Sequence, residues 1–108
     1  MPYDETLDAR ISDVVTPWGA TRKKMFGGTG YLLAGNLMTG VWHDSLIVRL
    51  SPEDGAAALA RPNVVPFDVT GRPMRGWVMV EPAGVADGAS LLEWLLAART
   101  HAESLPPK

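Results

Sequence analysis

The chain has 108 residues, of which 46% are hydrophobic and 20% are charged, a mix typical of one globular domain. It contains no cysteine, which excludes disulfides, thiol nucleophiles and zinc sites built on thiolates. The net charge of −2 argues against a dedicated nucleic-acid-binding module, because such modules usually carry a basic excess.

The first predicted element is a helix over residues 4–15. Carboxylates at Asp4 and Glu5 suit the positive end of a helix dipole, and Pro17 ends the helix. Apolar residues recur at helical spacing and form one stripe: Tyr3, Leu7, Ile11, Val14 and Val15. An acidic start of this kind does not resemble a signal peptide, and no apolar run reaches the length of a membrane span. We therefore expect a cytoplasmic protein with no membrane contact.

Residues 22–50 alternate with a period of two, which predicts an antiparallel sheet. Two-residue turns are predicted at Gly35-Asn36 and His43-Asp44, because these residue types tolerate the left-handed conformation. The predicted strands cover residues 29–34, 37–42 and 45–50. Residues 22–26 are either a further strand or an approach to the sheet.

These turns fix a predicted register, in which each pair shares one face of the sheet: Leu32 with Thr39, Thr39 with Val48, Val41 with Leu46, and Leu37 with Leu50. We expect the helices to cover that apolar face. The opposite face collects Tyr31, Leu33, Met38, Trp42, Ile47 and Arg49. Because nothing else in a two-layer protein would cover it, we expect a protein partner there, in the first place a second copy of the chain. The predicted interaction face consists of Tyr31, Met38, Trp42, Ile47 and Arg49.

The second half of the chain begins with a helix that Ser51 caps, with Pro52 at its first position. This helix should end at residue 59 or 60. A short strand over 64–69, a loop over 70–76 and a strand over 77–81 follow. Asp87 caps the last predicted helix, which ends before Pro106.

No constellation of residues predicts an active site. The glycine-rich stretch 27–30 continues into a strand and lacks the following Lys of a phosphate loop, so we interpret it as a bulge or a close strand approach. His43 and His101 are the only histidines, and no nucleophile or metal-ligand spacing accompanies them. We predict no catalytic, cofactor-binding or metal-binding residue, and hence no enzyme.

Basic residues occur in two places that could form an anion or nucleic-acid patch if they converge: Arg22, Lys23, Lys24, Arg72 and Arg75. The alternative is that the first three protect a solvated edge strand with their charges.

Three strings carry a resemblance to a known family. They are Lys-Lys-Met-Phe-Gly-Gly at 23–28, Gly-Arg-Pro-Met-Arg-Gly-Trp-Val at 71–78 and Ser-Leu-Pro-Pro-Lys at 104–108. In this order and separation they resemble the N-terminal domain of the TfoX/Sxy competence regulators, over nearly the whole chain. The resemblance implies a single domain over residues 1–108, the stand-alone form of a domain that full-length members follow with a second one. It implies an α+β fold, α-β(3)-α-β(2)-α in two layers, similar to secretion chaperones.

The resemblance also implies a regulatory role in the transcription of bacterial DNA-uptake genes, exerted together with a cyclic-AMP receptor-type activator. It supplies no catalytic residues. Three functions therefore stay open: a non-enzymatic protein-interaction domain, which we favour, a nucleic-acid-binding module that uses the basic residues, and a small-ligand-binding domain with a pocket between helix and sheet.

Overall fold

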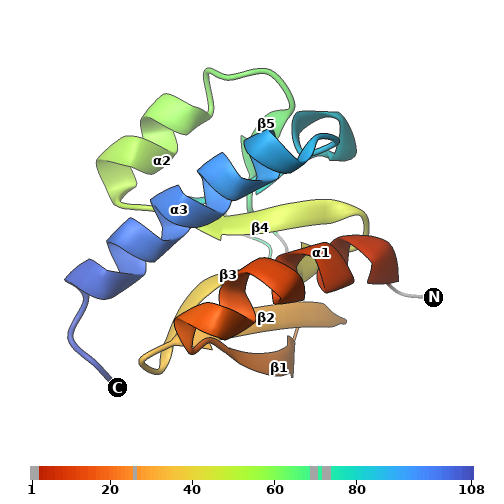
Figure 1. Ribbon diagram of the computed structural model, residues 1–108. Coiled ribbons are helices and arrows are strands. Elements are labelled where there is room, and N and C mark those ends of the chain that lie inside the picture. The colour runs from red at the N-terminus through yellow and green to blue at the C-terminus, as the bar shows by residue number, and fades with distance from the viewer. Residues whose placement is uncertain (1–2, 26, 69–70, 72–73) are drawn as a thin grey trace.

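The computed structural model describes residues 3–25, 27–68, 71 and 74–108 (Figure 1). In chain order the elements are α1 (Glu5–Val15), the short 3-10 helix η1 (Thr16–Trp18), β1 (Thr21–Met25), β2 (Gly28–Leu33), β3 (Asn36–Trp42), β4 (Ser45–Arg49), α2 (Pro52–Ala58), β5 (Val64–Pro66), β6 (Trp77–Val80), the 3-10 helix η2 (Pro82–Gly84) and α3 (Gly88–Ser104).

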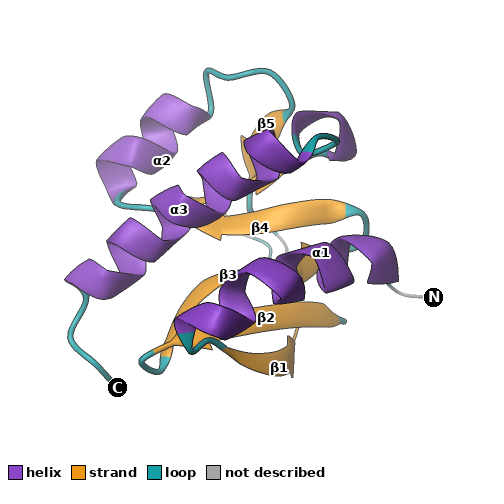
Figure 2. Cartoon of the chain, viewed as in Figure 1, coloured by secondary structure: helices purple, strands orange, loops and turns teal. Residues whose placement is uncertain are grey.

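The six strands form one antiparallel sheet in the order β1-β2-β3-β4-β6-β5. α1 and α3 lie across one face of this sheet, and α2 lies beside α3 (Figure 2). The predicted α+β class and the predicted order of helices and strands are confirmed. Residues 21–25 form a strand, β1, which settles the alternative left open for that segment.

The helices begin where the sequence predicts, because capping side chains accept hydrogen bonds from the free backbone N–H groups of the first turn. The carboxylate of Asp4 accepts hydrogen bonds from the backbone N–H groups of Thr6 and Leu7 at 2.9 and 3.0 Å. Ser51 and Asp87 each accept one, at 3.1 and 3.0 Å, from the third residue after them. Asp4 is therefore a cap that precedes α1, not a residue of its first turn.

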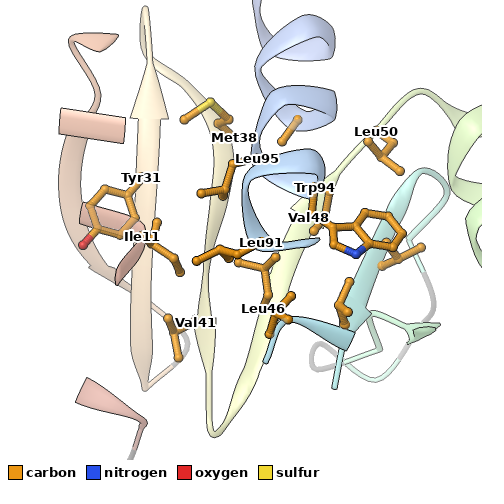
Figure 3. Packing of buried hydrophobic residues seen from close by; sticks show 14 of the residues in the cluster. Ile11, Tyr31, Met38, Val41, Leu46, Val48, Leu50, Leu91, Trp94 and Leu95 are labelled. Carbon is orange, nitrogen blue, oxygen red and sulfur yellow. The ribbon is translucent and has the colours of Figure 1, made fainter. Parts of the chain in front are cut away.

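The main core lies between the sheet and the layer of α1 and α3. Figure 3 shows Ile11 of α1 near Tyr31 and Leu95 of α3 near Met38. The alternating residues of β4 and β6 that point to this side, Leu46, Val48, Val78 and Val80, are almost fully buried. The intervening residues Ile47 and Met79 belong to a separate cluster on the other face, which confirms the predicted alternation in these strands.

The second hairpin has the predicted register from Thr39 to Trp42. The predicted pairing of Leu37 with Leu50 is wrong, because Leu50 lies in the core beneath the helices and Leu37 on the other face. Thr39 pairs with Val48 and Val41 pairs with Leu46, and the turn between the strands is made by His43 and Asp44. His43 adopts a φ of 56°, in the left-handed region that a two-residue hairpin turn requires.

The first hairpin differs from the prediction by one residue. Leu33 pairs with Asn36, so the turn is Ala34-Gly35, at φ values of 52° and 82°, and not Gly35-Asn36. Asn36 lies in the strand because its buried amide Nδ2 donates to the backbone oxygen of Pro106 at 2.9 Å. The backbone N–H of Lys108 donates to the oxygen of Ala34 at 2.8 Å, so the chain after α3 is held on this turn.

The shift in pairing ends at a β-bulge, which changes the face of the sheet to which the neighbouring side chains point. Tyr31 pairs with Thr39 and Leu32 pairs with Leu37, which leaves Met38 as an extra residue. The predicted pairing of Leu32 with Thr39 is therefore wrong. Tyr31 and Met38 belong to the core beneath the helices, and Leu37 lies on the opposite face beside Gly30.

The opposite face has a small core of its own. Ile47, Met79 and Phe67 are buried together there, and Met74 and Trp77 pack against them. The segment around Phe67 thus covers part of the face for which only a partner was expected.

Two glycines allow β2 and β3 to approach closely. A Cβ atom at Gly28 would collide with the backbone oxygen of Val41, and one at Gly40 with that of Thr29. The interpretation of stretch 27–30 as a close strand approach is confirmed for Gly28. None of the helices in the described part of the chain has the length and apolar character that a bilayer crossing needs.

Candidate functional site

The predicted interaction face does not exist as one surface. Tyr31 and Met38 are 1% and 0% exposed beneath the helices, and Ile47 is 1% exposed beneath Phe67. Trp42 and Arg49 keep the predicted side and are half-buried. The physical reason is the bulge at Met38, together with the cover that the chain's own segment around Phe67 supplies.

The outer face of α3 carries an apolar surface that the sequence analysis did not single out. Leu92 and Leu96 are four residues apart, so they lie on the same side of the helix on successive turns. They are 41% and 44% exposed, whereas Leu91 and Leu95 of the same helix are buried. We call Leu92 and Leu96 the α3 ridge.

A buried carboxylate joins α1 to the first two strands. Asp8 Oδ2 accepts hydrogen bonds from Arg22 Nε and Nη2 at 3.1 and 2.9 Å. Asp8 Oδ1 accepts hydrogen bonds from the hydroxyl groups of Thr29 and Tyr31, each at 2.8 Å. Arg22 Nη2 also donates to the Tyr3 hydroxyl at 3.0 Å. We call these five residues the Asp8 cluster.

The Asp8 cluster sets the ionisation of its members. Burial alone would raise the pKa of Asp8, but the hydrogen bonds from Arg22, Tyr31 and Thr29 outweigh it and hold the pKa below its ordinary value. Burial and the hydrogen bond to Asp8 raise the pKa of Tyr31 to about 12. The hydrogen bonds and charge of Asp8 raise the pKa of Arg22. The cluster is therefore a neutral tyrosine and an ion pair throughout the physiological range, which suits a structural role.

The basic residues do not gather in one place. Arg22 and Lys24 alternate with Lys23 along β1, so they point to opposite sides of the sheet. Arg75 precedes β6, and β6 is separated from β1 by β2, β3 and β4. Arg72 lies outside the described residues. The described residues of the predicted patch therefore lie in two separate places. In the first of these, on β1, Arg22 already forms an ion pair with Asp8.

An apolar pocket of about 220 Å³ opens between α2 and the segment that leads into β6. Residues of several elements line it, among them Ala56, Leu59, Pro66, Met74, Arg75 and Trp77. A second groove of about 230 Å³ runs between α2 and α3 over Trp94. Arg61 lies over the Trp94 ring at 4.2 Å and forms an ion pair with Glu93 at 3.4 Å, so its charge is already matched.

The two histidines lie apart, one in the β3–β4 turn and one on α3. The His43 ring lies 4.0 Å from that of Trp42. Burial, followed by the charge of Arg49, lowers the pKa of His101. Within the described ranges, no group of three or more His, Asp or Glu side chains could hold a metal ion.

Comparison with protein families gives a match over most of the chain. The model of the TfoX N-terminal domain matches residues 14–102, which is most of the chain. The chain belongs to the TfoX N-terminal domain family. No curated protein and no solved structure matches it significantly.

Membership of the TfoX N-terminal family confirms the predicted resemblance. The matched residues include the first two strings, and the third, at 104–108, lies beyond them. The matched region begins inside α1 and ends inside α3. It therefore contains all three sheet residues of the Asp8 cluster, both grooves and the α3 ridge.

Sequence reasoning missed three features of this TfoX N-terminal domain. Asp8 was not distinguished from the other acidic residues of the first helix, although it directly follows Leu7 of the buried stripe. The exposure of Leu92 and Leu96 could have been expected from the sequence, because α3 carries leucines on more than one side. One buried stripe would need leucines on a single side only. A pocket between helix and sheet was one of the open alternatives, but its location beside Arg75 was missed, because α2 and the segment before β6 are far apart in the sequence.

Proposed function

We propose that this TfoX N-terminal domain is a non-enzymatic regulatory domain that acts in the bacterial cytoplasm by binding protein. The single observation that carries the proposal is the α3 ridge, where Leu92 and Leu96 are both more than two fifths exposed on successive turns. Isolated exposed leucines are ordinary on protein surfaces, but adjacent ones on one helix face present a continuous apolar strip.

The partner we propose first is a second copy of the chain. A two-fold arrangement would bring the α3 ridges of both copies together. The ridge of each copy would then cover the ridge of the other. Family membership supports the regulatory role, and the resemblance to competence regulators supports a link to the transcription of DNA-uptake genes. Another regulatory protein is the alternative occupant of the ridge.

Sedimentation velocity on the full chain tests the proposal, at concentrations on the order of tens of micromolar, where weak dimers are populated. We expect a dimer for the natural chain and a monomer for the double variant Leu92→Glu/Leu96→Glu. Leu59→Glu is the matched control, because Leu59 is 42% exposed but lies at the end of α2, where it lines the pocket between α2 and β6. The control variant should still dimerise.

A monomeric natural chain would leave the alternative partner to be tested. In that case the natural chain, used as bait in its host, should retain a regulatory protein that the double variant loses. A monomer whose retained proteins are unaffected by the double variant would refute the proposed ridge. Transcription of DNA-uptake genes in a host that carries only the double variant tests the regulatory link.

A further inference from the structure

Backbone contact fixes the distance between the two walls of the pocket, α2 and the segment before β6. A Cβ atom at Gly55 of α2 would lie 2.5 Å from the Cα atom of Gly76, so the helix and the β6 approach are in direct backbone contact. Gly76 adopts a φ of 84°, which favours glycine. Because two glycines fix this separation, the pocket walls are in place before any ligand arrives.

The aromatic wall of the pocket is also fixed. The Trp77 ring lies 5.5 Å from the ring of Phe67, and the guanidinium of Arg49 lies 5.3 Å from the Trp77 ring centre. Arg49 pairs with Trp77 across the neighbouring strands β4 and β6. Trp77 therefore presents a supported apolar surface to the pocket.

The charge beside this apolar surface is positive. Among the described lining residues, Arg75 is the only charged one, and neither it nor Arg49 forms an ion pair within the part of the chain that the structure describes. The neighbouring groove over Trp94 differs, because Glu93 already pairs with its arginine. A free guanidinium next to an apolar cavity complements a ligand that joins an apolar group to a carboxylate.

The volume limits the size of that ligand. The pocket measures about 220 Å³, above the roughly 150 Å³ at which an apolar protein cavity accepts a benzene ring, and below the roughly 300 Å³ at which drug-sized sites begin. Because the pocket opens to solvent, this volume sets the size of the enclosed part of a ligand, which is one ring or one short branched chain.

We propose that this pocket binds a small hydrophobic monocarboxylate, with its ring or branched chain against Trp77, Met74 and Leu59 and its carboxylate toward Arg75. The site is separate from the α3 ridge, so it goes beyond the proposed protein interaction, and either proposal can fail without the other.

The test is a titration of the isotopically labelled full chain with phenylacetate, followed by NMR. The indole N–H signal of Trp77, assigned with Trp77→Phe, reports on the pocket directly. We expect saturable shifts of this signal and of the Ala56 and Leu59 amides, with a Kd of about 1 mM, as a ligand of this size allows. Phenylacetamide, which has the same ring without the charge, should bind about tenfold more weakly, because a charge-assisted hydrogen bond is lost.

Three variants sharpen the test. Arg75→Gln should weaken phenylacetate binding about tenfold and leave phenylacetamide binding unchanged. Ala56→Leu, on the exposed side of α2, should fill the pocket and abolish binding of both compounds. Arg61→Gln, in the neighbouring groove, is the matched control and should change neither.

Several outcomes would overturn the proposal. One is the absence of shifts at Trp77 up to the solubility of phenylacetate. A second is equal binding of acid and amide together with no effect of Arg75→Gln. A third is binding of an acetylated Asp-Phe dipeptide amide at this pocket when phenylacetate does not bind, which would assign the site to a peptide instead.

Discussion

The carboxylate of Asp8 in α1 accepts two hydrogen bonds from the guanidinium of Arg22 in β1, at 3.1 and 2.9 Å. The acid side chain is 12% exposed and the guanidine side chain 41% exposed, so the ion pair sits at the boundary between core and solvent. The other Asp8 oxygen faces inward and receives the hydroxyl groups of Thr29 and Tyr31. One carboxylate thus fixes α1 onto β1 and β2.

Asp8→Asn should lower the free energy of unfolding by about 2 kcal/mol, because the buried donors lose a charged acceptor while the half-exposed Arg22 regains water. Urea denaturation measures the change. Glu103→Gln is the control, since its ion pair with Arg99 on the surface of α3 should contribute less than about 0.5 kcal/mol. Equal effects of the two variants would show that the Asp8 cluster adds no more than a surface pair.

Alkaline unfolding should depend on Tyr31. Its folded pKa is raised to about 12, so the fold favours the neutral hydroxyl. That contribution is complete below the unfolded pKa of about 10 and is lost as the pH rises through the folded value. Stability should therefore fall between pH 10 and 12, and Tyr31→Phe should remove this part of the fall. Denaturant midpoints across this range, measured on both proteins, provide the check.

Acid unfolding should depend on Asp8 in the opposite sense. Its folded pKa lies below the ordinary value, so its contribution is complete above the unfolded pKa of about 3.9 and is lost as the pH falls through the folded value. The natural chain should lose stability below pH 4 more steeply than Asp8→Asn does. Parallel curves for the two proteins in acid would contradict the depressed pKa.

The bulge makes a prediction about neighbouring residues of β3. Met38→Ala should destabilise the fold by about 3 kcal/mol, because Met38 is fully buried near Leu95. Leu37→Ala should cost less than about 1.5 kcal/mol, because Leu37 is only half-buried on the opposite face. The reverse order of the two effects would indicate the hairpin register without the bulge.

The close approach of β2 and β3 predicts an intolerance to the smallest side chain. Gly40→Ala should destabilise by at least about 2 kcal/mol, since the new methyl group would meet the backbone of Thr29. Gly88→Ala, at the first position of α3 with open space around it, should be neutral or stabilising by up to about 1 kcal/mol. Thermal unfolding of both variants distinguishes the two environments.

The fold was predictable where one local rule decided each element. The caps at Ser51 and Asp87, the alternation in β6 and the second hairpin all follow from residue type and spacing. The first hairpin did not, because Ala34 adopts a positive φ that alanine rarely takes, and the tether between Asn36 and Pro106 draws on a segment 70 residues away. No local pattern contains that contact.

The candidate sites were less predictable than the fold. Asp8 and Arg22 are 14 residues apart, and only the packing of α1 on the sheet selects this pair among several acids and bases. The predicted interaction face failed for two reasons. The shifted first hairpin and its bulge place Tyr31 and Met38 in the core beneath the helices, and the segment around Phe67 covers Ile47. Arg75 was singled out for its charge. Met74 and Trp77 lie next to it in the sequence, but the facing wall comes from α2 and β5, which sequence proximity does not reveal.

The two borders of the sheet bear on how copies of this domain can meet. β1 exposes a run of three cations, and β5 is only three residues long and ends at Pro66, which has no N–H to donate. Strand-by-strand growth from one molecule into the next is therefore disfavoured at both borders. At high concentration this protein should stay dispersed or pair through its helices, and it should not form a continuous β-sheet that runs from one molecule to the next.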